Sequence, residues 1–318
     1  MADFLASILE AIHRLVGSYG WAIILFTLLI KLLLLPLEYK SRKGMKQMER
    51  LQPELVALQQ KYANDKEKLN QKTAELYQKQ HINPLSGCLP MLLSMVVLFI
   101  MFSAMRQVAN FQMAQQTLLF LAEGTFQNEG FLWIRNLWMP DSPFSAAMPT
   151  VAQLAQIPAE SWLQAYSSLS AEQLSALPMG ITFDFSGNTC AATVEAIATY
   201  MHTLPDYVSS VQTIPSLTGI NLLFAKISVY AQGNGWLVLP ILSCLTQILM
   251  TRITQSKSAS QNQNAQSMKR MNSIMPLFSL FICLGYNASF ALYWVVSNLF
   301  AILQTLLLNR IFSKEIAN

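Results

Sequence analysis

The sequence predicts an all-α integral membrane protein with five transmembrane helices, a cytoplasmic helical hairpin and an N-terminal amphipathic helix. Of its 318 residues, 53% are hydrophobic and only 12% are charged, whereas a soluble domain carries about 25% charged residues. Several apolar runs approach the length of about 20 residues that a helix needs to cross a bilayer. Lysine and arginine gather in alternate segments between these runs, which is typical of cytoplasmic loops.

This charge pattern predicts an N-terminus outside the cell and a C-terminus in the cytoplasm. The predicted segments are an outer-surface amphipathic helix (1–18), transmembrane helices at 19–39, 84–106, 235–251, 272–286 and 289–309, a cytoplasmic helical hairpin (40–83), an extracytoplasmic insertion (107–234), a cytoplasmic loop (252–271) and a short cytoplasmic tail (310–318).

The N-terminal segment lacks the pattern of a cleavable signal peptide, because Asp3, Glu10 and Arg14 interrupt its apolar residues. The apolar residues recur every three or four positions, which predicts an amphipathic helix lying along the outer membrane surface. An unanchored soluble terminus is the alternative. The apolar positions are Phe4, Leu5, Ile8, Leu9, Ile12, Leu15 and Val16.

The first predicted span contains a lysine, Lys31, inside the apolar run from Gly20 to Leu37. Charged residues within a span are rare and mark functional sites by default. One interpretation is that the lysine stem extends toward the polar residues from Glu38 onward, roughly 9 Å further along the helix. The other is that the ammonium faces a polar cavity within the bundle. Thr27, one turn earlier, shares its helical face and favours a polar stripe.

The hairpin segment is rich in Lys, Gln, Glu and Leu and divides near Asn64 and Asp65 into two helices, the first starting at Pro53. Each helix carries one mainly apolar stripe, as an antiparallel hairpin requires. This hairpin is either a solvated face or an element that docks a protein or the membrane surface. Pro84 and Pro90 bracket the start of the second span and favour a kinked entry.

The extracytoplasmic insertion carries only Arg135 and Lys226 against eight Asp and Glu residues and predicts no clear fold. Short amphipathic helices are predicted at 159–177 and 192–203. The aromatic residues of FLWIRNLWMP (131–140) are interpreted as anchors at the membrane interface rather than as a ligand site.

Polar residues recur in the last three spans. Trp294, Ser297 and Asn298 share one face of the final helix because they are three and four positions apart. Together with Thr27, Lys31 and Gln247, they are candidates to line a polar pocket in an apolar bundle. For the neutral residues, ordinary hydrogen bonding between helices is the alternative, worth about 0.6 kcal/mol on average in membranes.

Enzyme chemistry is the weakest interpretation, because the three histidines, His13, His81 and His202, lie outside the predicted spans. The sequence also contains no phosphate-binding loop and no metal-ligand spacing, so we expect no catalytic residue, no metal and no cofactor. A small-solute transporter or channel with Lys31 as its binding charge is the second hypothesis, although the internal repeats of transporters are not found.

Six motifs follow one another along the chain. They are YGWAIILFTLLIKLLLLPL (19–37), LQPELVALQQKYANDKEKLNQKTAELYQKQHINPLSGCLP (51–90), FLWIRNLWMPDSP (131–143), NGWLVLPIL (234–242), IMPLF (274–278) and FALYWVVSNLFAILQ (290–304). Taken in this order, they resemble the YidC/Oxa/Alb family of membrane protein insertases, and the resemblance covers about 17–103, 131–143 and 234–310.

This resemblance implies a bacterial plasma membrane protein whose five core spans surround a hydrophilic groove open to the cytoplasm and the lipid. Hydrophobic segments of nascent membrane proteins would leave along the groove into the bilayer while their short polar tails cross. Lys31 would replace a family arginine, Thr27 would be a groove threonine, and Trp294 would lie along the substrate path. Lysine keeps the charge but lacks the bidentate fork of arginine.

The resemblance further implies the Sec translocon and the ribosome as candidate partners and no direct contact with nucleic acid. Because only eight residues follow Arg310, we do not expect ribosome binding through a long basic tail. The lack of an additional first span and of a large outer domain suggests a Gram-positive-type member. The stretch 145–233 exceeds the family pattern, and the sequence assigns it no role.

Overall fold

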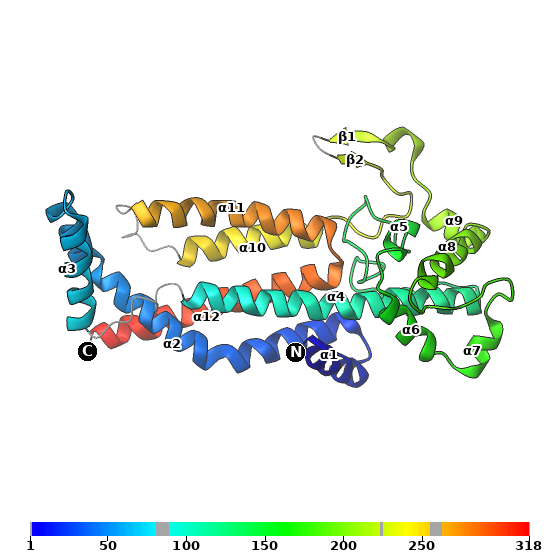
Figure 1. The fold of residues 1–318 in the computed structure, drawn as a ribbon, viewed down its shortest axis with the longest axis horizontal. Coiled ribbons are helices and arrows are strands. Elements are labelled where there is room, and N and C mark those ends of the chain that lie inside the picture. The colour runs from blue at the N-terminus through cyan, green and yellow to red at the C-terminus, as the bar shows by residue number, and fades with distance from the viewer. Residues whose placement is uncertain (1, 81–88, 223–224, 255–262, 318) are drawn as a thin grey trace. The chain divides into compact units, whose positions relative to one another are not determined.

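The computed structural model describes residues 2–80, 89–222, 225–254 and 263–317, and it is helical apart from one antiparallel pair of short strands (Figure 1). The elements are α1 (Ala2–Val16), α2 (Tyr19–Lys61), α3 (Lys66–Lys79), α4 (Leu89–Glu123), α5 (Val151–Leu154), α6 (Ala159–Ser167), α7 (Ala171–Ala176), α8 (Thr189–Met201), α9 (Pro205–Ser210), a 3₁₀ turn (Pro215–Leu217), β1 (Ile220–Leu222), β2 (Ala225–Ile227), α10 (Val238–Thr254), α11 (Gln263–Gly285) and α12 (Ala288–Ala317).

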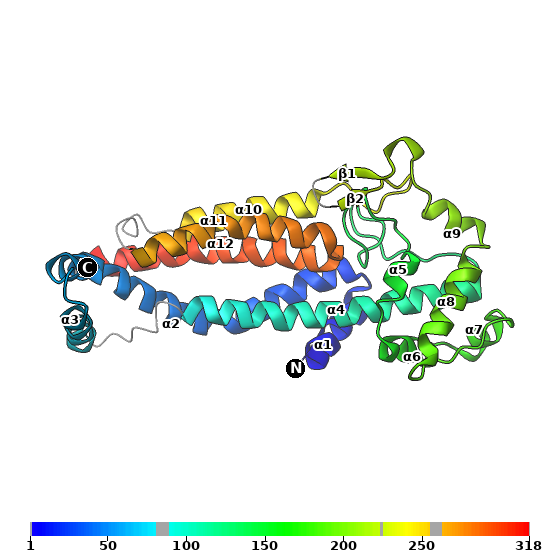
Figure 2. The same cartoon turned by 45° about the horizontal axis from the view of Figure 1, so that its top comes forward.

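The chain divides into two compact units, each of which is described by itself. The insertion unit comprises Met1–Phe26, Met101–Ser243 and Leu280–Val295. The hairpin unit comprises Thr27–Ile100, Cys244–Ser279 and Val296–Asn318. Within the hairpin unit, the parts of α10, α11 and α12 run alongside one another in both views (Figures 1 and 2).

Helices of membrane-spanning length and composition identify a helical membrane protein. In the described part of the chain, three helical stretches are long and apolar enough to span, namely Tyr19–Met48, Met95–Glu123 and Ala288–Ile311. Two shorter apolar stretches, Val238–Ile253 and Ile274–Gly285, fall below that length. The start of the predicted second span, including Pro84, lies outside the described residues.

Helix α2 is continuous for 43 residues and passes through both Pro36 and Pro53. The prediction that a separate helix starts at Pro53 is therefore wrong. A proline inside a helix removes one backbone hydrogen bond, and the flanking run of Lys, Gln, Met, Glu and Leu consists of strong helix formers. The chain turns after Lys61, and Asp65 caps α3 by accepting a hydrogen bond from the Lys68 backbone N–H at 3.0 Å.

Helix α4 extends well past residue 106, the predicted end of the second span, and stops only at Glu123. Residues 107–123 contain neither glycine nor proline, so nothing in the local sequence interrupts the helix. Gly124 ends it with a φ of +74°, and its N–H donates to the Phe120 carbonyl at 2.9 Å. The apolar span is thus joined by an unbroken helix to the insertion.

Helices α5, α6 and α8 of the insertion lie around the C-terminal part of α4 (Figure 2). Together they form a subdomain with a hydrophobic core of its own. Trp162 is fully buried and stacks on Phe185 with ring centroids 5.3 Å apart. The Tyr207 hydroxyl donates to the Pro149 carbonyl at 3.3 Å, and burial raises the pKa of Tyr207 to about 12. The sequence predicted two short helical segments but no clear fold here, because local periodicity does not show how short helices pack into a common core.

The predicted helix 159–177 is divided into α6 and α7. Ser170 begins α7 with a capping box, in which its hydroxyl accepts from the Gln173 N–H at 3.2 Å and its own N–H donates to the Gln173 side chain at 2.9 Å. The second predicted helix, 192–203, corresponds to α8.

A buried carboxylate holds the start of α10. Asp141 is fully buried and accepts hydrogen bonds from the Trp133 indole at 3.1 Å and from the Trp236 and Leu239 backbone N–H groups at 2.8 and 2.7 Å. The N-terminal N–H groups of a helix lack partners within the helix and attract negative charge. Asp141 thereby fixes segment 131–143 to the first turn of α10.

Two buried asparagines complete this arrangement. The Asn234 side-chain amide donates to the carbonyls of Asn136, Met139 and Pro140 at 2.8 to 3.1 Å, and its oxygen accepts from the Asn136 N–H at 2.8 Å. The carbonyls of Met139 and Leu137 accept in turn from the first N–H groups of α12, both at 2.9 Å. We call Asn136, Asp141 and Asn234 the polar knot, since they connect the starts of α10 and α12.

The polar knot also corrects the interpretation of the aromatic patch. Trp138 and Phe131 were expected to anchor the protein at the membrane interface, but they are only 1% and 9% exposed. Trp138 packs edge-on against Tyr19 with ring centroids 4.8 Å apart. The patch therefore belongs largely to the protein interior.

We predict that Asp141→Asn destabilises the protein by about 2 kcal/mol or more. The amide oxygen can replace one acceptor, but the NH₂ group would face N–H donors and leave charge-assisted hydrogen bonds unmade. Thermal unfolding of the purified protein in detergent provides the measurement. Asp206→Asn is the matched control, because Asp206 is an exposed acid in the first turn of α9. Equal Tm values for the two variants would contradict the role assigned to Asp141.

Candidate functional site

The membrane-spanning part of α2 has two sides of opposite character. Thr27 is fully buried, and the side chains of Lys31 and Glu38 are only 15% and 18% exposed. By contrast, Leu32 and Leu33 are 56% and 66% exposed. Residues spaced by four and seven positions lie on one helical face, so the polar residues face the interior and the leucines face outward.

Lys31 is paired with Glu38 on the same helix. The Lys31 Nζ donates to Glu38 Oε1 at 3.3 Å, across two helical turns. The lysine stem therefore extends in the direction of the predicted polar exit, as the first interpretation of this residue expected. The ammonium group is, however, paired with a carboxylate that is itself largely shielded from solvent. Its charge is therefore neutralised by Glu38 and not by exposure to water.

Glu38 is the residue that sequence analysis missed. It was assigned to the polar exit of the first span, although its spacing of seven from Lys31 places both side chains on one face of a helix. A base inside an apolar run and an acid seven residues later, directly after the run, are the signal that identifies such a pair, because an unpaired charge in a span is costly.

The final helix contributes a second polar contact within the hairpin unit. The Asn298 side-chain amide donates to the Thr246 hydroxyl oxygen at 3.2 Å, which joins α12 to α10. Thr246 is 6% exposed, whereas the predicted residues Gln247 and Ser297 beside this contact are half-buried. Thr246 was not selected from the sequence, because helical periodicity does not show which of two adjacent polar residues faces a neighbouring helix.

Trp294, the remaining predicted site residue, belongs to the insertion unit. It is 5% exposed and packs edge-on against Phe290 with ring centroids 5.6 Å apart. Its indole N–H is buried and has no hydrogen-bond partner among the residues that the structure describes. Phe290 also contacts Phe102, Tyr286 and Tyr293, so Trp294 lies within an aromatic cluster.

Hydrogen bonds therefore join Lys31 to Glu38 and Asn298 to Thr246. Thr27 is placed near Lys31 by helical spacing alone, and Gln247 and Ser297 are the sequence neighbours of Thr246 and Asn298. Among the described residues, no group of three His, Cys, Asp or Glu side chains could hold a metal ion.

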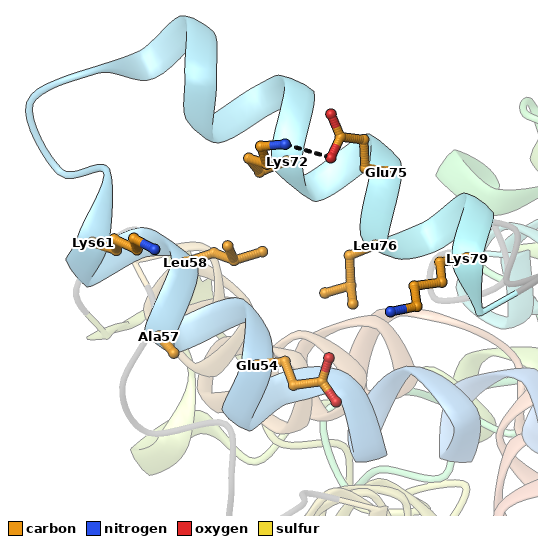
Figure 3. A pocket seen from close by; sticks show the side chains of 8 residues that line it. All are labelled: Glu54, Ala57, Leu58, Lys61, Lys72, Glu75, Leu76 and Lys79. Carbon is orange, nitrogen blue, oxygen red and sulfur yellow. Dashed lines mark hydrogen bonds and ion pairs between the residues drawn. The ribbon is translucent and has the colours of Figure 1, made fainter.

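An open pocket with a volume of about 360 Å³ lies between the end of α2 and α3 (Figure 3). Leu58 and Leu76 point toward one another from the two helices and form its apolar floor. Three lysines and two glutamates surround this floor. The full lining is Glu54, Ala57, Leu58, Lys61, Lys72, Glu75, Leu76 and Lys79.

The rim of this pocket carries a net positive charge. Lys72 pairs with Glu75 at 2.6 Å, and this hydrogen-bonded partner raises the pKa of Lys72. The other two lysines on the rim, Lys61 and Lys79, are opposed by only one further glutamate of the rim, Glu54. An apolar floor with a basic rim is suited to an apolar side chain whose neighbours are acidic.

The chain is similar to one family of membrane proteins over most of its length. A family model described as "60Kd inner membrane protein" matches residues 11–203 and 207–315. The membrane protein insertase YidC of Fusobacterium nucleatum subsp. nucleatum is 50% identical over 106 residues, which is 33% of this chain and 52% of that protein. The YidC of Caldanaerobacter subterraneus subsp. tengcongensis is 40% identical over 137 residues, 43% of this chain and 59% of that protein.

A longer relative shows the same similarity over a smaller share of its length. The YidC of Anaeromyxobacter sp. is 39% identical over 140 residues, which is 44% of this chain and 23% of that protein. The chain thus spans just over half the length of the first two curated relatives and about a quarter of the third.

We predict a coupling energy of about 1 kcal/mol between Lys31 and Glu38, above that of most surface pairs and below that of a fully buried pair. A double-mutant cycle with Lys31→Met and Glu38→Gln, read out by thermal unfolding in lipid nanodiscs, measures it. The Lys72–Glu75 pair, with Lys72→Met and Glu75→Gln, is the control, because its side chains are 44% and 49% exposed. A coupling at Lys31–Glu38 no larger than that of the control pair would show that the pair is not shielded.

Proposed function

The chain belongs to the 60Kd inner membrane protein family, which confirms the resemblance to the YidC/Oxa/Alb insertases, and we propose that it is itself a membrane protein insertase. It would move short polar tails of nascent membrane proteins across the bilayer and release their hydrophobic segments into lipid. The relatives named above as insertases support this activity, and the motifs that carry the resemblance lie in the matched region.

The proposed topology has five membrane spans, formed by α2, α4, α10, α11 and α12. The N-terminus would lie outside and the C-terminus in the cytoplasm, because basic residues dominate the segments before α4 and between α10 and α11. In this orientation, the end of α2 and α3 form a cytoplasmic hairpin. The subdomain built on the end of α4 would face the outside.

The observation that carries the proposed mechanism is the inward-facing polar side of α2. Lys31 and the buried Thr27 lie one turn apart on the side opposite the exposed leucines. We assign this side to the hydrophilic groove, together with Gln247, Ser297 and Asn298 of the same unit. The family resemblance alone assigns Trp294 to the substrate path. Polar side chains in that position hold water inside the membrane, which shortens the hydrocarbon barrier that a polar tail must cross.

Glu38 makes the proposed capture of a substrate an exchange reaction. In the resting protein, Glu38 neutralises Lys31 at 3.3 Å. An incoming acidic tail would replace the Glu38 carboxylate beside the ammonium, and the departure of the tail would restore the internal pair. The net gain is then the difference between two attractions that are each a few kcal/mol at an effective dielectric of about 20. Such capture is weak enough to permit release.

Burial of the substrate's apolar segment in lipid would supply the driving force. At about 25 cal/mol per Å² of apolar surface, removing such a segment from water outweighs a transient ionic contact. The proposed cycle requires no nucleotide, metal or other cofactor, and it is not enzymatic.

We propose that the pocket between the end of α2 and α3 makes the first contact with substrates or partners on the cytoplasmic side. Its apolar floor and basic rim would accept an apolar side chain with acidic neighbours, either on a nascent chain or on a partner such as the Sec translocon or the ribosome. Anionic lipid is the remaining candidate for this rim.

The central test is reconstitution of the purified chain in liposomes with a single-span substrate carrying an acidic tail. We predict that Lys31→Arg retains insertion, that Lys31→Ala lowers it about tenfold, equivalent to about 1.4 kcal/mol, and that Lys31→Glu is worst. The same substrate with a neutral tail is the control and should respond weakly. Equal insertion by all three variants would remove Lys31 from the mechanism. A parallel solute-flux assay tests the transporter hypothesis, which requires flux that depends on Lys31.

A second test concerns the hairpin. Replacing α3 with a Gly/Ser linker of equal length should abolish insertion, because the pocket loses one wall and Leu58 loses its partner Leu76. The membrane spans should remain folded. Insertion and the Tm in detergent are measured together. Lys66→Ser, an exposed change at the start of α3 outside the pocket, is the matched control. Undiminished insertion by the linker variant would exclude the hairpin from substrate reception.

A further inference from the structure

The segment between α4 and α10 contains a strained turn that aims a leucine outward. Phe131 and Ile134 exchange two backbone hydrogen bonds of 3.0 Å, which leaves Leu132 and Trp133 as the two residues of the turn. Leu132 has a φ of +54°, in the region where a two-residue hairpin turn normally places glycine. The next residue, Trp133, is held to the fold because its indole donates to Asp141.

This turn lies against the first turn of a membrane span. The Phe131 ring packs on Gly20 so closely that a Cβ at residue 20 would come within 2.1 Å of it. Phe131 also meets Trp21 edge-on with ring centroids 5.6 Å apart. Because Gly20 and Trp21 open α2, Leu132 is placed at the level where that span begins.

The same turn is tied to the start of α10. The Arg135 N–H donates to the Asn234 carbonyl at 3.1 Å, and the Trp236 N–H donates to Asp141 at 2.8 Å. Trp236 precedes α10 by two residues. The packing of Phe131 on Gly20 and Trp21, together with these hydrogen bonds, therefore places the turn that carries Leu132 at the beginnings of two apolar helices.

All three of these side chains are exposed, although each is large and apolar or aromatic. Leu132 is 72% exposed, Trp236 76% and Trp21 56%. The adjoining helices continue the exposed apolar surface with Leu25 on α2 and Ile241 on α10. Such helix surfaces face lipid in a membrane protein, and tryptophan favours the interface between lipid and water.

We propose that Leu132, flanked by Trp21 and Trp236, is a lipid-inserting anchor that fixes the depth at which α2 and α10 enter the outer leaflet. A glycine would satisfy the backbone of this turn without strain, so the fold gains nothing from a leucine whose side chain touches little protein. The polar knot holds the strained turn in place and directs the side chain away from the protein. The occupant of this surface is phospholipid, not a protein partner.

The experiment places an environment-sensitive fluorophore on Leu132→Cys, in full-length protein whose four natural cysteines are replaced by serine. The protein is reconstituted in phosphatidylcholine vesicles that contain lipids brominated at defined depths. We expect quenching by shallow bromines severalfold above that of the same label on Met179→Cys. Met179 is the matched control, because it is fully exposed and lies on the insertion subdomain after α7. Equal quenching at the two positions, whether strong or weak, would overturn the proposal.

A second variant separates anchoring from packing within the fold. Leu132→Gly should leave the Tm in detergent equal to or above that of the parent, because it relieves the positive φ and removes no buried contact. In vesicles, the same change should lower the quenching of a label at Trp236→Cys severalfold. A Tm that falls by several degrees, or unchanged quenching at position 236, would show that Leu132 serves the fold rather than the membrane contact.

Discussion

The organisation of the insertion unit depends on one requirement, that helices beginning in a buried environment need partners for their first N–H groups. Asp141 supplies this for α10, and the carbonyls of Leu137 and Met139 supply it for α12. Both depend on Asn234, which holds the carbonyls of segment 136–140 in place. A short segment after α4 thereby determines where two later helices start, although about 100 residues of an independent subdomain separate it from α10.

The insertion subdomain is compatible with this requirement because its first and last residues both lie at the polar knot. Ala146 pairs with Gly233, and Asn234 donates to the Ser145 carbonyl at 2.8 Å. Pro143 also packs so closely on Gly233 that a Cβ there would come within 2.8 Å of its backbone. The two ends of the subdomain are thus side by side. A segment whose ends are closed in this way can vary in length without disturbing the helices it interrupts.

Helical spacing was sufficient to predict the features that lie within one helix. The apolar runs predicted the three helical stretches that are long and apolar enough to span a membrane in the described part of the chain. Thr27 and Lys31 were found on one face of α2 because four residues make about one turn. The Lys31–Glu38 pair follows from the same rule and was missed only because Glu38 was assigned to the helix end. The end of α4 was misplaced for another reason, since the sequence marks a helix stop at Gly124 and not at the end of the apolar run.

Features that join distant residues could not be predicted from periodicity. Asn136 and Asn234 are 98 positions apart, and Asn298 and Thr246 are 52 positions apart. Nothing in the local sequence distinguishes a buried asparagine of this kind from an exposed loop residue. For the same reason Trp138 was expected at the membrane interface, although the polar knot draws segment 136–140 inward and leaves the tryptophan 1% exposed.

The charge distribution constrains how a captured tail could leave the proposed groove. Residues 107–234 carry eight acidic and two basic side chains, a net charge of 2 − 8 = −6. In the proposed orientation, this acidic subdomain faces the side to which substrate tails are delivered. Because like charges repel within a Debye length of about 8 Å at physiological ionic strength, this net charge disfavours the binding of acidic tails. In the proposed cycle, a tail that leaves Lys31 would be held by neither group, since Glu38 would pair with the ammonium again and the subdomain would repel the carboxylate. This combination would favour release of the tail over its retention by the protein.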